Sequence, residues 1–178
     1  MRARARNMLE KKLINELQEY IEEHLKLSCA RDTRVYASVL CESMRRYEDI
    51  PGDELETFIK RTRKPTFHQL LFGFIDQKGA ADSDIYKKAG IDRRHFSKIR
   101  SNPNYRPGKN TAIALAVALE LSKEETGLLL GAAGFSLSES DLFDLVIQFF
   151  LEKKIYDLHT INLALDYFSL KPLAGAVE

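Results

Sequence analysis

The sequence predicts an all-α protein made of short helices. Apolar residues recur at helical spacing along most of the chain, and no run shows the apolar/polar alternation of a half-buried strand. Helix-starting residues and glycines divide the chain into short segments. With 178 residues, 44% hydrophobic and 30% charged, the chain is long enough to form one domain or a pair of small domains, each with a buried core.

The first part of the chain, 1–64, is expected to form a helical arm or small domain that dimerises or contacts a partner. Apolar residues at helical spacing predict an amphipathic helix over Met8–Leu25 and a second helix over Thr33–Arg46. The apolar residues within Leu55–Ile59 predict a short third helix. The basic stretch Lys60–Pro65 is expected to be a linker, because its proline disfavours helical backbone at the residue before it.

A second region, 65–178, starts with a capping box. Thr66 and Gln69 have the spacing at which each side chain bonds the other residue's backbone N–H, so a helix is expected from here to Gly79. The segment Asp82–Ser101 then predicts two short helices around a tight turn at Gly90.

Four more helices follow. Asn110 or Thr111 is expected to cap the Ala/Leu-rich run after the SNPNYRPG loop, and Ser122 with Glu125 forms another capping box. That helix is expected to end near Gly134. Two C-terminal helices are then predicted, the first over DLFDLVIQFFLEKK with a cap at Ser138 or Ser140, and the second over Leu158–Phe168. Their aromatic and aliphatic residues require a packing partner.

The two short helices around Gly90 have the pattern of a helix-turn-helix, in which one helix supports a second that enters the major groove of DNA. Asp92 is expected to cap the second helix. Five apolar residues are spaced to form a small shared core: Ile85, Ala89, Ile91, Phe96 and Ile99.

Charge is segregated although the net charge is only +1. Between Ile85 and Lys109 there are eight cations and one anion, whereas Gly134 to Glu178 holds seven acids and three lysines. This separation indicates one surface suited to a polyanion and another that is acidic. The cations of the first group are Lys87, Lys88, Arg93, Arg94, Lys98, Arg100, Arg106 and Lys109.

The span Phe67–Gly134 resembles the lambda-repressor-like (Xre-type) helix-turn-helix domain: a leading helix, the two-helix unit around a glycine, a polar loop, an Ala/Leu-rich fourth helix, and a fifth helix that starts with SKEE and ends with GAAGF. The resemblance implies a five-helix bundle and DNA binding. The phrase GIDRRHFSKIRSNPNYRP, followed by an Ala/Leu helix and GFSLS, carries a softer resemblance, over Thr66–Pro172, to a bacterial C-terminal helix-turn-helix module found on varied proteins, whose role is poorly defined. Two features depart from the Xre pattern. Tyr86 occupies a position where the family usually has alanine, and acids stand at Asp82 and Asp84 where phosphate would approach.

The candidate DNA-binding residues lie mainly on the predicted recognition helix, Asp92–Ser101. Arg93 and Arg94 are expected to read base edges, because a guanidinium pairs bidentately with guanine. Ser97, Lys98 and Arg100 are better placed for phosphates or groove walls. The set is completed by Lys87, Arg106 and Lys109.

These observations predict a sequence-specific DNA-binding transcriptional regulator that acts on double-stranded DNA as a homodimer, since one short helix reads only a few base pairs. The alternative is a non-catalytic adaptor or regulatory subunit of a bacterial stress or defence system that reuses the fold to bind a protein partner. The acids at Asp82 and Asp84, Tyr86 and the apolar C-terminal helices favour this alternative.

Other classes are not expected. The Walker A, GxGxxG, HExxH and GxSxG motifs of nucleotide-binding and hydrolytic enzymes do not occur in the sequence, so we expect no enzyme and no cofactor. Cys29 and Cys41 lack metal-ligand spacing, which predicts reduced thiols and no metal. No apolar run is long enough for a membrane span, and no secretory signal precedes the first helix, so a bacterial cytoplasmic location is expected.

Overall fold

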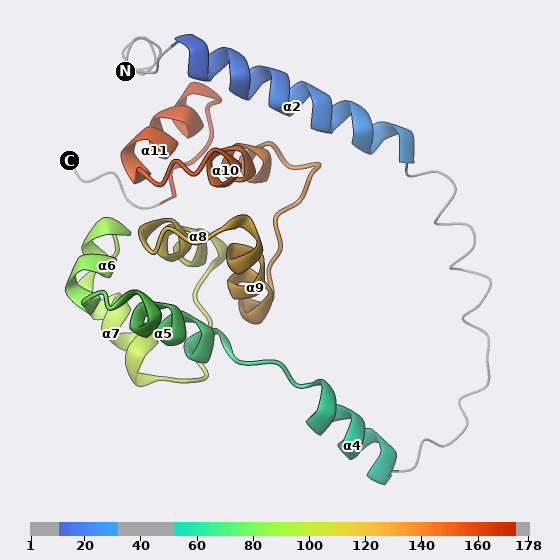
Figure 1. The fold of residues 1–178 in the computed structure, drawn as a ribbon, viewed down its shortest axis with the longest axis vertical. Helices are drawn as coiled ribbons and strands as arrows, with labels where there is room; N and C mark the ends of the chain where they lie inside the picture. Colours follow the sequence, from blue (N-terminus) through green and yellow to red (C-terminus); the bar gives the residue numbers. More distant parts are fainter. Residues whose placement is uncertain (1–10, 32–51, 174–178) are drawn as a thin grey trace.

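The protein is all helical in the parts of the chain that the structure, a computed structural model, describes: residues 11–31 and 52–173. This confirms the predicted fold class. The expected helix over Thr33–Arg46 lies outside the described residues. The helices are α2 (Lys11–Arg31), α4 (Gly52–Thr62), α5 (Phe67–Lys78), α6 (Asp82–Lys88), α7 (Arg93–Ser101), α8 (Lys109–Ala118), α9 (Lys123–Ala133), α10 (Leu142–Glu152) and α11 (Leu158–Tyr167) (Figure 1).

Helix α8 is the centre of the bundle. Its residues from Ala112 to Ala118 are all buried, so the helix is apolar on every side and is enclosed by its neighbours. It packs against α6, α9 and α11, and α9 in turn packs against α5. The alanines of α8 have small side chains that let the neighbouring helices approach closely.

The predicted helix boundaries are confirmed where their chemistry is local. Thr66 and Ser122 both form complete capping boxes. The backbone at Gly79, Gly90 and Gly134 is left-handed, with φ of 60°, 61° and 88°, which glycine adopts without steric cost.

Two predicted caps are wrong. Helix α8 begins at Lys109 after Gly108, before the expected Asn110 or Thr111, and α10 is capped by Asp141. The expected caps of α10 are engaged elsewhere, because the Ser138 and Ser140 hydroxyls bond each other at 2.8 Å. The expected linker is also partly helical, because α4 continues to Thr62.

Helix α2 packs on the C-terminal helix α10, so part of the expected N-terminal region joins the C-terminal end of the bundle (Figure 1). Leu17 and Ile21 of α2 are buried in the common core. At the edge of this contact Lys153 Nζ lies 2.7 Å from the Glu16 carboxylate, and the Tyr20 hydroxyl donates to Glu152 at 3.0 Å. No described helix is long and apolar enough to cross a membrane.

Candidate functional site

Helices α6 and α7, with the turn between them, form the framework of the site. The inward side chains Ile85, Ala89, Phe96 and Ile99 are all buried, and Ile91 in the turn is partly buried against the core. This is the shared core that the spacing predicts. The Gly90 and Ile91 N–H groups donate to the Lys87 and Tyr86 carbonyls, the paired bonds that close a helix before a left-handed glycine.

The opposite face of α7 is polar and exposed. Asp92 caps the helix by accepting a hydrogen bond from the Arg94 N–H at 2.7 Å, so the first turn is held in helical geometry. Among the predicted site residues, the exposed members on this helix are Arg93, Arg94, Ser97, Lys98 and Arg100. No hydrogen bond or ion pair joins the Arg93 or Arg94 side chain to another described side chain, which leaves both guanidinium groups open to a ligand.

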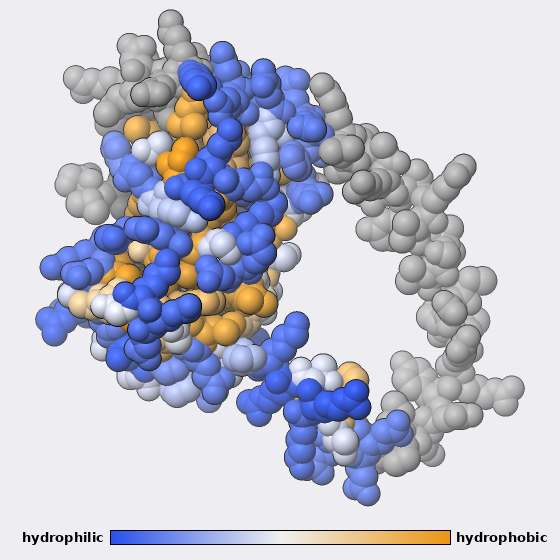
Figure 2. Space-filling model, in the orientation of Figure 1, coloured by the Kyte–Doolittle hydropathy of each residue, from blue (hydrophilic) through white to orange (hydrophobic). Residues whose placement is uncertain are grey.

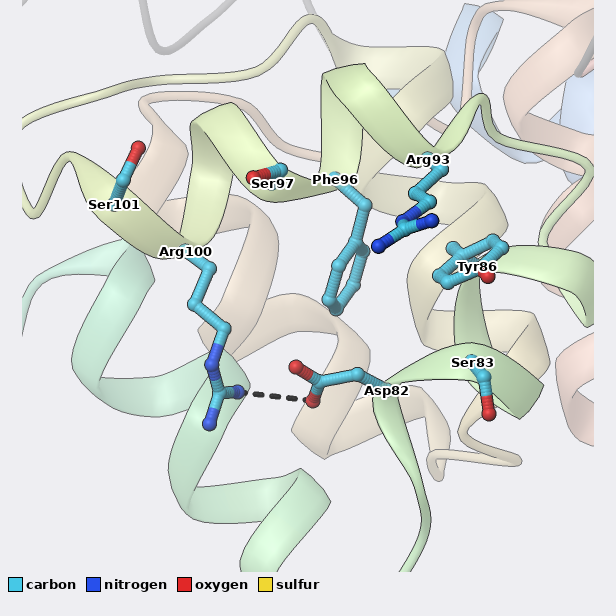
Figure 3. A pocket seen from close by; sticks show the side chains of 8 residues that line it. All are labelled: Asp82, Ser83, Tyr86, Arg93, Phe96, Ser97, Arg100 and Ser101. Atoms are coloured by element: carbon cyan, nitrogen blue, oxygen red, sulfur yellow. Dashed lines mark hydrogen bonds and ion pairs between the residues drawn. The ribbon is translucent and has the colours of Figure 1, made fainter.

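A cleft of about 410 Å³ lies between α6 and α7 (Figure 3). Its walls combine cations of α7 with the acid that begins α6: Arg93 and Arg100 face the same space as Asp82. The Arg100 guanidinium lies 2.9 Å from the Asp82 carboxylate and also stacks over the Phe72 ring, 4.5 Å from its centroid. Arg100 is therefore paired within the protein although it stays exposed, whereas the Arg93 side chain has no such ion pair among the described residues.

Tyr86 also lines this cleft, and its ring lies at the edge of the shared core. The ring centroid is 5.8 Å from that of Phe96, and the side chain is only partly buried. The large residue is thus accommodated by placing its ring beside Phe96 at the cleft. Together with Asp82 it makes the cleft part apolar and part acidic.

A second hollow, of about 370 Å³, lies where the start of α5 meets the loop after α7. It gathers Arg106 with two cations of the expected linker, Arg63 and Lys64. Tyr105 joins this hollow to α7, since its ring lies 4.7 Å beneath the Lys98 ammonium and its hydroxyl is 3.2 Å from His95 Nε2. Tyr105 thus contacts Lys98 and lines the same hollow as Arg106.

Two predicted site residues lie apart from these groups. Lys87 is exposed in the last turn of α6 and lines neither hollow. Lys109 begins α8, and its Nζ lies 2.6 Å from Asp144 Oδ2, a carboxylate that is 1% exposed. Lys109 thus joins α8 to α10, and its side chain is largely enclosed.

Three residues that line these two hollows are not among the predicted DNA-binding residues: Arg63, Lys64 and Asp82. Arg63 and Lys64 fall in the expected linker, and Asp82 is predicted only as an acid where phosphate would approach. Asp82 does not cap α6, which begins after Ala81 with no side-chain cap bond. The signal for the first two was the basic run KRTRK placed directly before a capping box. No local signal pairs Asp82 with Arg100, because the two are 18 residues apart and meet only across the turn.

The described residues contain no group of three or more His, Cys, Asp or Glu side chains arranged to hold a metal ion. Comparison with known proteins finds no match. No family model matches the chain, and no curated protein or solved structure matches it significantly.

Proposed function

We propose that the protein binds double-stranded DNA in a sequence-specific manner and regulates transcription, with α7 as the recognition helix. The observation that carries the proposal is the two-sided character of α7. Phe96 and Ile99 seat one face in the core, while Arg93 and Arg94 stand exposed and unpaired on the N-terminal half of the other. That is the half from which a recognition helix contacts base edges.

The dimensions of α7 suit this role. An α-helix with its side chains is about 10–12 Å across, which fits a major groove about 12 Å wide, and the nine residues of α7 span about 13 Å along it. The order of the five short helices α5 to α9 is also the order that the Xre-type resemblance implies. In this proposal Arg93 and Arg94 read bases, while Lys98 and Arg106, which both lie near Tyr105, contact phosphates.

A single helix of this length reads only a few base pairs, so the proposed regulator acts as a homodimer on two half-sites. Each further phosphate contact adds affinity that falls with salt, because binding releases condensed counterions. The hollow formed with Arg63 and Lys64 supplies further cations for such contacts.

A second candidate function is protein binding by an adaptor that keeps the fold without DNA. One observation favours it: Asp82 stands in the same cleft as Arg93 and neutralises Arg100. A carboxylate at this point repels phosphate, and the partly apolar cleft beside Tyr86 and Phe96 suits an aromatic side chain of a protein.

The deciding experiment is a fluorescence-anisotropy titration of random-sequence DNA and of DNA from upstream of the gene, at two salt concentrations. The test variant is Arg93→Ala/Arg94→Ala. The control is Lys154→Ala/Lys171→Ala, which removes two exposed cations from the α10–α11 end and matches the change in net charge.

The proposal predicts tight, salt-sensitive binding that prefers one sequence. The Arg93→Ala/Arg94→Ala variant should lose that preference, at about 1–3 kcal/mol for each guanine contact, while the control binds as the wild type does. If the wild type does not bind DNA even at low salt, the proposal is overturned and the adaptor function is favoured. If both variants lose the same amount of DNA affinity, the protein is attracted to the charge of DNA and does not recognise a sequence.

A further inference from the structure

Helix α4 carries an apolar face that no described part of the chain covers. Leu55, Phe58 and Ile59 are 50%, 63% and 53% exposed, although each is a large hydrophobic residue. Their spacing of three and four residues places them on one side of the helix. In Figure 1 α4 stands away from the bundle, and Figure 2 shows apolar colour at its surface.

The other amphipathic helix of the N-terminal region does not offer such a face. The sequence makes the helix that begins near Met8 a candidate dimer interface, but in α2 Leu17 and Ile21 are buried against the bundle, at 3% and 7% exposure. The apolar side of α2 is thus used within the chain. Helix α4 is the one whose apolar side remains open among the described helices.

The charges of α4 indicate what covers this face. Its first turn carries Asp53 and Glu54, and its last turn carries Lys60 and Arg61. Two copies laid side by side in opposite directions place the acidic end of each helix beside the basic end of the other. Parallel copies would instead bring like charges together. The helix is therefore complementary to itself in the antiparallel arrangement, which a two-fold axis produces.

We propose that α4 is the dimerisation element of this protein, pairing antiparallel with α4 of a second copy through Leu55, Phe58 and Ile59. An interface of one three-turn helix per copy is below the area of stable dimers, so the association is weak and reversible. This inference deepens the proposed function, because a weak protein dimer gains from two DNA half-sites that hold both copies together. It is tested without DNA, so that its failure is distinguishable from the failure of DNA binding.

The first test is sedimentation equilibrium of the full chain from micromolar to millimolar concentration, with two matched variants. Phe58→Ser removes the most exposed apolar residue of α4. Leu128→Ser removes a similarly exposed one, at 56% against 63% for Phe58, from α9. We expect the wild type and Leu128→Ser to form dimers with the same dissociation constant, and Phe58→Ser to weaken the dimer at least tenfold. Unfolding in urea should be unchanged in Phe58→Ser, because Phe58 is not part of the core.

The second test examines the charge complementarity. Lys60→Glu/Arg61→Glu makes both ends of α4 acidic, and Asp53→Lys/Glu54→Lys makes both ends basic. Each variant alone should be monomeric, because like charges then face each other, and an equimolar mixture should form the mixed dimer. Recovery in the mixture also shows that the single variants had not lost the helix.

Three outcomes would overturn the proposal. A wild-type chain that stays monomeric at every concentration means that α4 does not pair with itself. A dimer that survives Phe58→Ser, or one that Leu128→Ser weakens instead, places the interface elsewhere. If the mixture of the two charge variants stays monomeric, antiparallel pairing of α4 is excluded.

Discussion

The Arg100 guanidinium and the Asp82 carboxylate, 18 residues apart in sequence, lie 2.9 Å from each other across the cleft between α6 and α7. The pair is partly exposed, so its own contribution to stability is small. Its significance is electrostatic, because it places a negative charge within the cationic surface that the proposed DNA contact uses.

Asp82→Asn should raise the affinity for DNA. The change removes a charge that repels phosphate and releases Arg100 to contact the backbone, which we expect to tighten binding roughly threefold to tenfold at low salt and less at high salt. The measurement is the anisotropy titration described above. Asp166→Asn, an exposed acid on α11, is the control for net charge. An unchanged affinity would mean that the cleft does not face DNA.

Lys109→Met should destabilise the fold. It leaves the Asp144 carboxylate, 1% exposed, without its cation, at a cost of about 2–4 kcal/mol in the free energy of unfolding. The double variant Lys109→Met/Asp144→Asn should cost less than Lys109→Met alone, because no buried charge is then unpaired and the amide oxygen still accepts from the Ser138 N–H. Urea unfolding measures both. The exposed pair of Lys123 and Glu152 provides the comparison, and Lys123→Met should cost under about 1 kcal/mol.

Lys154→Gly should stabilise the protein. Lys154 ends α10 in left-handed backbone with φ of 55°, and its N–H and that of Ile155 close the helix by donating to the Leu151 and Phe150 carbonyls. A side chain costs about 1–2 kcal/mol in this conformation, from which the greater flexibility of unfolded glycine must be subtracted, so a gain of up to about 1 kcal/mol is expected. Gly90→Ala, at the equivalent position after α6, should instead destabilise the protein, because it places a side chain on left-handed backbone. Thermal unfolding of both variants tests this pair.

The stability that Asp157 contributes should depend on pH. The hydrogen bond from the Thr160 hydroxyl is the main cause that lowers the pKa of the Asp157 carboxyl below its ordinary value of 3.8, against a smaller opposing effect of burial. A folded-state pKa below the unfolded one means that the contribution is complete above that ordinary value and is lost as the pH falls through the folded value. Thr160→Val should therefore be less stable than the wild type at pH 7, and the difference should shrink in acid. A difference that stays constant down to acid pH would contradict this account.

Local chemistry explains why the helices could be predicted from the sequence. The capping boxes at Thr66 and Ser122 and the turn at Gly90 each depend on residues within a few positions of one another, so they can be recognised in the sequence. The predicted site on α7 is local in the same sense, because Asp92 and the spacing of Phe96 and Ile99 determine which face is exposed. Three other helices end in left-handed backbone at Glu120, Lys154 and Ser169, which no composition signal indicates.

The sequence by itself therefore determined the all-helical class, most helix limits and the polar face of α7, since these follow from periodicity and short-range hydrogen bonds. Tertiary structure alone decided which charges are free. It pairs Arg100 with Asp82 and Lys109 with Asp144, and it leaves Arg93 and Arg94 open. In the folded chain the apolar side of α2 packs against α10, whereas the apolar side of α4 is not covered by any described residue. The physical reason is that ion pairs and apolar contacts form between groups that are close in space, and the chain brings distant residues together only when the whole core packs.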